Sequence, residues 1–166
     1  MRETDRIVDQ LRRAADGDAW FGPSVRAALE GVDADAATAR PLAGAHTICE
    51  IVLHMTGWTR EVTRRLRVGS ARDPEDGDWP DRSVATEAEW TAVVAAFDAA
   101  NEELAEAIAR LDESALAERI GDVRDRALGS GVSRYVTLHG LGQHHAYHAG
   151  QIMLLKRALQ GSGDRA

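Results

Sequence analysis

The sequence of 166 residues holds a single cysteine, Cys49, so no internal disulfide bond can form. It also lacks any run near the roughly 18 consecutive apolar residues that a membrane-spanning helix needs. Residues 1–6, Met-Arg-Glu-Thr-Asp-Arg, lack the apolar segment of a signal peptide. These absences favour a cytoplasmic protein with no membrane partner.

Positive charge is scarce as well. The chain has 20 lysine and arginine residues against 27 aspartate and glutamate residues, which gives a formal net charge of −7. Because the acidic residues are dispersed, no basic surface is available to bind nucleic acid or an acidic membrane. We therefore expect a small-molecule substrate and no nucleic-acid partner.

Patterns typical of β-strands are missing too, since the sequence shows neither alternating runs of β-branched residues nor an Asn-Gly turn. A hydrophobic fraction of 44% beside 28% charged residues is usual for a folded domain. The length suits one domain over residues 1–166. The predicted fold class is therefore all-α.

Apolar residues recur at helical spacing in several long segments, which predicts a four-helix bundle with long connections between the helices. Thr86, with Glu89 three residues later, and Ser133 are the expected caps of the third and fourth helices. A shorter helix is expected to start at Pro23 and end at Leu29. The four long helices are expected over residues 4–15, 45–68, 86–111 and 134–159.

Two connections carry large aromatic side chains. Residues 70–82 contain two prolines, a glycine and several acidic residues, which indicates a loop. Thirteen residues are more than a plain turn needs, so this loop is either a wall or lid of a pocket or a solvated crossover pinned by Trp79. Trp20 and Phe21, after the first helix, are expected to anchor the core. The tail over residues 161–166 is expected to be frayed.

The last helix contains the chemically most informative motif. His144 and His148 are four residues apart, so they lie about 40° apart on one helical face and their imidazoles can converge on one point. This is metal-ligand spacing, although surface or core histidines can also show it. A tetrahedral site needs a further protein ligand from another element.

His54, in the second long helix, is the candidate for that third ligand. Three protein ligands leave a coordination position open for water or substrate, as in catalytic sites. Glu50, one turn before His54, is a candidate catalytic base or a neighbour of the ligands. Gln151, one turn after His148, is a candidate to orient a ligand ring or a bound water.

Other residues near the motif are expected to have structural roles. His145 and His139 point away from the face of His144, by about 100° and about 140° respectively. His46 is two turns from His54, too far to share an ion easily, and a buried Cys49 is expected to be inert. Three glycines inside the last helix are costly there, which suggests that another backbone packs closely at Gly140, Gly142 and Gly150.

The pattern resembles the DinB/YfiT-like superfamily of metal-binding four-helix proteins. The resemblance is carried by Ile48-Cys-Glu-Ile-Val-Leu-His54 with Trp58 after it, and above all by His144-His-Ala-Tyr-His148-Ala-Gly-Gln-Ile152. The arrangement of Trp20-Phe-Gly-Pro-Ser, Asp78-Trp-Pro80 and Trp90 is similar to one branch of that family, so the likeness covers nearly the whole chain.

The resemblance implies a bundle with non-sequential helix connections, frequent pairing into homodimers, and a divalent metal held by three histidines. Those ligands fall on His54, His144 and His148, the same set that helical spacing selects. Family members with known activity include thiol-dependent S-transferases that use bacillithiol or mycothiol and a mycothiol-dependent maleylpyruvate isomerase.

Two classes of function remain open. The first is a metalloenzyme, with zinc as the first choice of ion and nickel as the second, that activates a low-molecular-weight thiol for S-transfer or water for hydrolysis. Thiol transfer needs little further acid–base chemistry, whereas hydrolysis usually needs a nearby carboxylate, for which Glu50 is the candidate. The second is a non-catalytic, dimeric metal-binding or stress-associated protein.

Overall fold

Helices form where the sequence repeats apolar residues at helical spacing. The computed structural model describes residues 1–122, 124 and 130–163. Within these residues no β-strand occurs, and no helix has both the length and the apolar character to cross a membrane. The elements are α1 (Glu3–Asp16), α2 (Val25–Leu29), α3 (Ala34–Thr38), α4 (Ile48–Val68), α5 (Glu87–Ala109), the 3-10 helix η1 (Glu113–Ala117) and α6 (Arg134–Gly163). The prediction of an all-α bundle of four long helices is confirmed.

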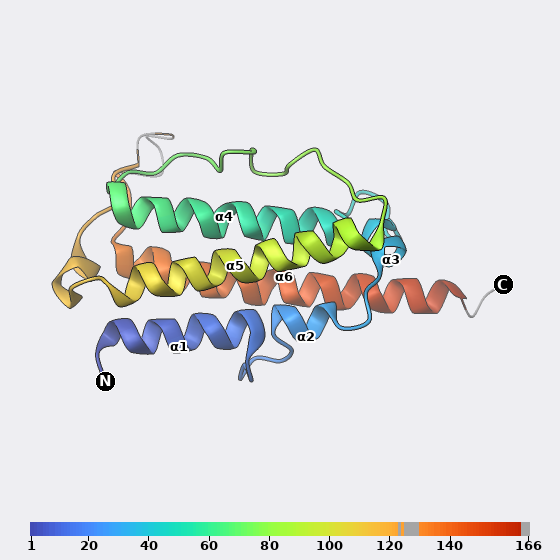
Figure 1. Cartoon of the computed structure of the whole chain (residues 1–166), viewed down its shortest axis with the longest axis horizontal. Helices are drawn as coiled ribbons and strands as arrows, with labels where there is room; N and C mark the ends of the chain where they lie inside the picture. Colours follow the sequence, from blue (N-terminus) through green and yellow to red (C-terminus); the bar gives the residue numbers. More distant parts are fainter. Residues whose placement is uncertain (123, 125–129, 164–166) are drawn as a thin grey trace.

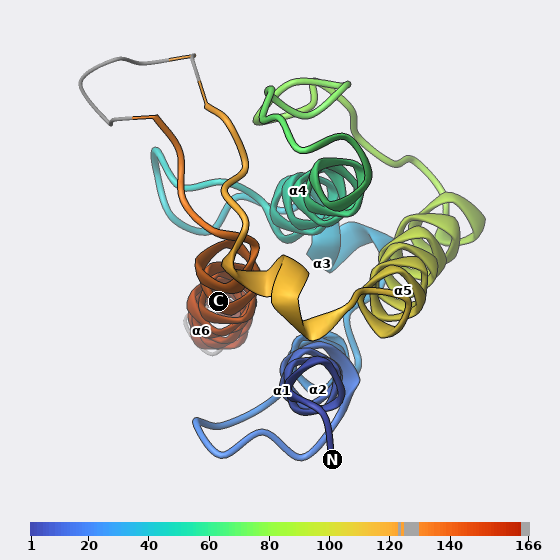
Figure 2. The same ribbon diagram turned by 90° about the vertical axis from the view of Figure 1, so that its left-hand side faces the viewer.

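The four long helices lie side by side with α4 and α1 at opposite corners and α5 and α6 at the other two (Figures 1 and 2). The short α2 continues the row that α1 begins. α4 and α5 run in the same direction, whereas α1 and α6 run in the opposite one (Figure 1). The connection between α4 and α5 therefore has to return along the whole length of α4, which explains why it is so long.

Side-chain caps set the starts of the helices. In α4 the Thr47 hydroxyl accepts a hydrogen bond from the Glu50 backbone N–H (3.1 Å), and the Glu50 carboxylate accepts one from the Thr47 N–H (2.9 Å). α4 thus begins three residues later than predicted, and His46 precedes the helix. Gly69 ends α4 with φ at 71°, a conformation that favours glycine.

The expected caps of α5 and α6 match the structure, whereas the expected start of α2 does not. Thr86 and Glu89 form the predicted capping box of α5, and the Ser133 hydroxyl accepts a hydrogen bond from the Val136 N–H at the start of α6 (3.2 Å). Pro23 is not the first residue of α2, because Ser24 caps that helix. α6 continues to Gly163, so the first part of the expected tail is helical, and residues 164–166 lie outside the described residues.

The core consists of two clusters along the bundle. One cluster, built mainly from α4, α5 and α6, contains Ile48, Val52, Met55, Trp90, Phe97 and Ile152, and the other contains Ile7, Leu66, Leu104, Ile108 and Leu138. The expectation that Trp20 and Phe21 belong to the core is wrong, since Trp20 is fully exposed and Phe21 is 47% exposed. They lie in the turn before α2, whose Val25 and Leu29 are buried.

The glycines of α6 also differ from expectation. A Cβ atom added at Gly140 or Gly150 would meet nothing within 4 Å, and one at Gly142 would meet only the Leu11 side chain, at 3.7 Å. Close packing of another backbone of the same chain is therefore not the reason for these glycines.

A buried carboxylate, Glu61 of α4, attaches the connection between α4 and α5 to α4. It is 3% exposed and accepts hydrogen bonds from the Nε atoms of Arg64 (2.8 Å) and Arg65 (3.0 Å) and from the Arg72 backbone N–H (3.0 Å). Burial alone would raise the pKa of Glu61, but these hydrogen bonds outweigh it and lower that pKa from 4.5 to about 2. Glu61 is therefore ionised throughout the neutral range.

We predict that Glu61→Gln lowers the free energy of unfolding at pH 7 by about 3 kcal/mol, because the arginines lose their buried counter-charge. The depressed pKa means that the wild-type stabilisation is complete above pH 4.5 and is lost as the pH falls toward 2. Urea denaturation at pH 7 and between pH 5 and 2 measures both effects. Glu75→Gln is the matched control on the nearby connection, and equal losses in the two variants would contradict the prediction.

Candidate metal centre

Three histidine side chains from two helices converge in the interior of the bundle. The Nε2 atom of His144 lies 2.9 Å from Nε2 of His54 and 3.1 Å from Nε2 of His148. Each residue offers one ligand atom, and these atoms all lie within 4.8 Å of one another. His54 is 5% exposed, His148 is 3% exposed and His144 is partly buried. The structure thus brings together the three residues that the sequence predicted as ligands.

Hydrogen bonds to the other ring nitrogens fix two of the imidazoles. The Nδ1–H of His54 donates to the main-chain oxygen of Asp78 (2.6 Å), and the Nδ1–H of His148 donates to Oε1 of Gln151 (2.6 Å). Because both acceptors are carbonyl oxygens, the neutral rings keep their protons on Nδ1 and leave a lone pair on Nε2. Gln151 therefore holds the ring of His148 in this orientation.

The arrangement fits a bound metal ion better than it fits hydrogen bonding alone. A proton on Nε2 of His144 can satisfy only one of the two facing lone pairs at a time, and Nδ1 of His144 has no hydrogen-bond partner among the described residues. A transition metal ion about 2.0–2.1 Å from each Nε2 would accept all three lone pairs at once. His54, His144 and His148 are the residues that would hold it.

The protonation state of the three rings also suits metal binding. Burial is the largest cause that lowers the pKa of His144, to about 3, and of His148, to about 4, and burial lowers the pKa of His54 as well. All three imidazoles are therefore neutral at pH 7, as metal ligation requires.

The long connection closes over His54. The ring of Trp79 stacks between those of His54, with centroids 3.9 Å apart, and His46, with centroids 3.5 Å apart. His46 is thus a neighbour of the site through Trp79 and not a ligand. The same connection forms one wall of a cavity of about 590 Å³ against α4 and α5, so it is a crossover pinned by Trp79 and also a cavity wall.

Glu50 is placed at the helix start rather than at the ligand atoms. Its carboxylate accepts hydrogen bonds from Arg40 (2.6 Å) and from the Thr47 N–H, and it contacts Nδ1 of His46 (3.1 Å). These contacts occupy both oxygens in capping α4. A role for Glu50 as catalytic base remains a prediction that this geometry does not favour.

The remaining candidates lie off the ligand face. His145 is fully buried, donates its Nδ1–H to the Leu141 carbonyl (2.8 Å) and packs against Phe97. Cys49 is 1% exposed, and burial raises the pKa of its thiol, which agrees with an inert cysteine.

Sequence reasoning missed Asp78, which supplies the acceptor for His54. The carboxylate oxygen Oδ1 of Asp78 also lies 3.3 Å from Nδ1 of His54 and accepts a hydrogen bond from the indole of Trp58 (2.7 Å). The available signal was the run Asp78-Trp-Pro80 in a loop that otherwise looks solvated. A contact through a main-chain carbonyl cannot be recognised from residue type, so only the fold reveals it.

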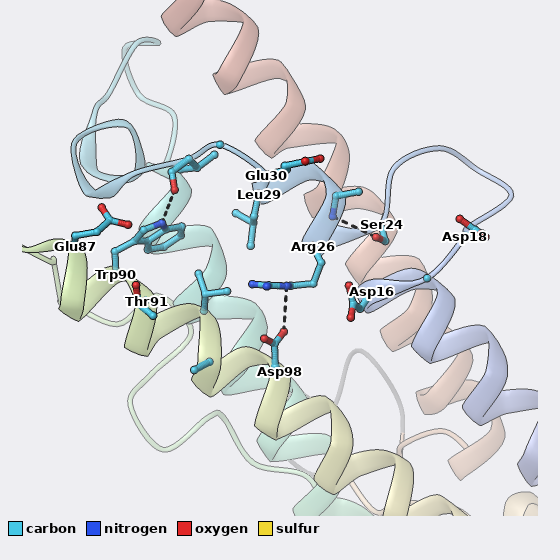
Figure 3. Close-up of a pocket in the computed structure, with 16 residues that line it drawn as sticks. Asp16, Asp18, Ser24, Arg26, Leu29, Glu30, Glu87, Trp90, Thr91 and Asp98 are labelled. Carbon is cyan, nitrogen blue, oxygen red and sulfur yellow. Dashed lines mark hydrogen bonds and ion pairs between the residues drawn. The ribbon is translucent and has the colours of Figure 1, made fainter.

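A cavity of about 810 Å³ lies away from the histidines, between α2 and α5 (Figure 3). Arg26 of α2 reaches across it toward Asp98 of α5, at 3.7 Å, and the indole of Trp90 donates to the main-chain oxygen of Val32 (2.7 Å). These contacts join α2 and the segment after it to α5. None of His54, His144 and His148 lines this cavity or the one of about 590 Å³.

The fold and site together define a helical-bundle protein with an internal three-histidine cluster suited to a metal ion. The family model of the DinB superfamily matches residues 23–152, more than three quarters of the chain. The chain belongs to the DinB superfamily. Comparison with curated proteins and with solved structures gave no match.

We predict that Gln151→Leu weakens metal binding by about 10- to 100-fold, because the ring of His148 loses the acceptor that fixes its orientation. Competition with a chromophoric chelator measures the dissociation constant. Gln143→Leu, at an exposed position of the same helix, is the matched control and should bind as the wild type does. Equal affinities for the two variants would show that His148 does not depend on Gln151.

Proposed function

We propose that this protein binds one divalent transition metal ion per chain through His54, His144 and His148. The observation that carries the proposal is the convergence of three Nε2 atoms while Nδ1 is held by a carbonyl oxygen in two of the rings. Neutral imidazoles suit zinc, which we place first, and nickel, which we place second.

The proposed activity is that of a metalloenzyme acting on a small-molecule substrate. A divalent ion, when bound, lowers the pKa of water and deprotonates a coordinated thiol, so either nucleophile would be present at neutral pH. The three histidines would hold the ion and leave a position open for the nucleophile. Because the Glu50 carboxylate is engaged at the helix start, we favour S-transfer with a low-molecular-weight thiol over hydrolysis.

A non-catalytic metal-binding role is the second candidate. It is supported by the burial of His54 and His148 and by the cavities of about 810 Å³ and about 590 Å³, neither of which these histidines line. An ion at such a site would link α4 to α6 and stabilise the bundle. In either role we place the protein in the cytoplasm, where a lone cysteine stays reduced.

We also propose that the protein is a homodimer that pairs through one face of α6. Val136, Tyr147 and Leu154 are 50%, 63% and 57% exposed on this face, which also includes Gly140 and Gly150. These positions fall within an arc of about 80° at 100° per residue. The stripe has no charged side chain in a chain with net charge −7, so two copies can meet there without repulsion.

Metal content tests the proposed site. We expect purified wild-type protein to contain, or to take up, one equivalent of zinc or nickel per chain by elemental analysis, and His148→Ala to lose it. His139→Ala, a histidine of the same helix outside the cluster, is the control and should keep the metal. A folded wild-type protein that takes up neither ion when supplied would refute the proposal.

The oligomeric state tests the α6 face. We expect a wild-type mass of two chains by light scattering after size exclusion, and a mass of one chain for Leu154→Arg, because the arginine places charge on the contact face. Val68→Arg, at a similarly exposed apolar position at the end of α4, should remain dimeric. A monomeric wild-type protein would contradict the prediction.

A further inference from the structure

Asp78 faces His54 with two oxygen atoms from one residue. Its main-chain oxygen accepts the Nδ1–H of His54 at 2.6 Å, and its carboxylate Oδ1 lies 3.3 Å from the same nitrogen. The other two rings differ, because His148 has the neutral amide of Gln151 as its acceptor and Nδ1 of His144 has no partner in the described part of the chain. Among the three ligand histidines, His54 alone has a carboxylate beside its outer nitrogen.

The Asp78 carboxylate is itself held in place although its side chain is 55% exposed. The indole Nε1–H of Trp58, on α4, donates to Oδ1 at 2.7 Å. The guanidinium groups of Arg65 and Arg124 lie over the ring of Trp58, at 5.3 Å and 5.9 Å from its centroid. Arg65 in turn donates a hydrogen bond to the buried carboxylate of Glu61. A continuous set of contacts thus leads from the core to Nδ1 of His54.

Trp79, the next residue, restrains the plane of the same imidazole. Its ring lies nearly parallel to that of His54, with an interplanar angle of 10°, and its other face stacks on His46 with an angle of 2°. Stacking limits tilting of the imidazole, whereas the hydrogen bond to Asp78 limits its rotation within that plane. Adjacent residues of one loop therefore define the direction in which Nε2 of His54 points.

We infer that Asp78 is a positioning residue of the metal centre, which holds His54 in the Nδ1–H tautomer and directs its Nε2 lone pair toward His144 and His148. The inference rests on the proposed metal-binding function. A carboxylate beside the outer nitrogen of a ligand histidine also makes the imidazole a stronger donor to the metal. Since Asp78 belongs to the connection between α4 and α5, the ligand geometry depends on the docking of that connection.

Two substitutions of Asp78 distinguish the effect of its charge from the effect of its side-chain contacts. Asp78→Asn keeps the main-chain acceptor and a side-chain oxygen but removes the charge, whereas Asp78→Ala removes the side chain and releases Trp58. We expect the dissociation constant for Zn²⁺, measured by competition with a chromophoric chelator, to rise about 100-fold in Asp78→Ala and about 10-fold in Asp78→Asn. Asp81→Asn, an exposed aspartate of the same loop, is the matched control and should leave the constant unchanged.

The visible absorption spectrum of the Co²⁺ form provides a readout that a loss of stability would not change. At saturating Co²⁺, Asp78→Asn should shift the ligand-field bands, because the donor strength of His54 changes while the three ligands remain. Trp58→Phe, which keeps an aromatic ring but removes the N–H donor, should weaken Zn²⁺ binding several-fold. If Asp78→Ala fails to fold, Asp78→Asn and Trp58→Phe still decide the question.

The outcomes distinguish the two proposals. A wild-type protein that takes up neither Zn²⁺ nor Co²⁺ would refute the metal site itself. A wild-type protein that binds one equivalent, together with folded Asp78 and Trp58 variants that match its affinity and its Co²⁺ spectrum, would overturn the positioning role and leave Asp78 as a loop contact only.

Discussion

The contact between α4 and α6 is the constraint on which the candidate site depends. His54 lies in the first third of α4, and His144 and His148 lie near the middle of α6, so only one relative placement of the two antiparallel helices brings their imidazoles together. The core between α4 and α6 is filled in this region by apolar side chains of both helices: Ile48, Val52, Met55 and Ile152. Because such cores are close-packed, the helices cannot slide without opening voids. The packing of apolar side chains therefore fixes where the nitrogen atoms meet.

The second constraint is the connection that returns along α4. Because α4 and α5 run in the same direction, the connection between them has to be long. A segment of this length without secondary structure would be mobile unless contacts attached it to the helices. Glu61 binds its first part through Arg72, and Trp79 stacks against His54 further along. The attachment contributes to stability and also orders the residues next to the site. The same contacts thus serve folding and the geometry of the ligands.

Helical periodicity was sufficient to predict the four long helices and to select the ligand histidines, because four-residue spacing is a property of any α-helix. It failed where position depends on contacts distant in sequence. Size alone favours Trp20 and Phe21 as core residues, whereas the structure buries Val25 and Leu29 of the following helix. Apolar spacing alone starts α4 at residue 45, because it does not reveal the Thr47 cap that begins the helix at Ile48. The role of Asp78 depends on its main-chain oxygen, which residue type does not reveal.

The charge of the site bears on its proposed chemistry. Three neutral imidazoles would add no charge to balance a bound divalent ion. The Asp78 carboxylate beside His54 and whatever fills the open position would have to balance it, in a region where His54 and His148 are buried. An anionic fourth ligand is therefore favoured over a neutral one. A free thiol, with an ordinary pKa of about 8.5, yields its anion far more readily than free water does. With the Glu50 carboxylate turned to the helix start, the proposed S-transfer needs less help from a protein base than hydrolysis would.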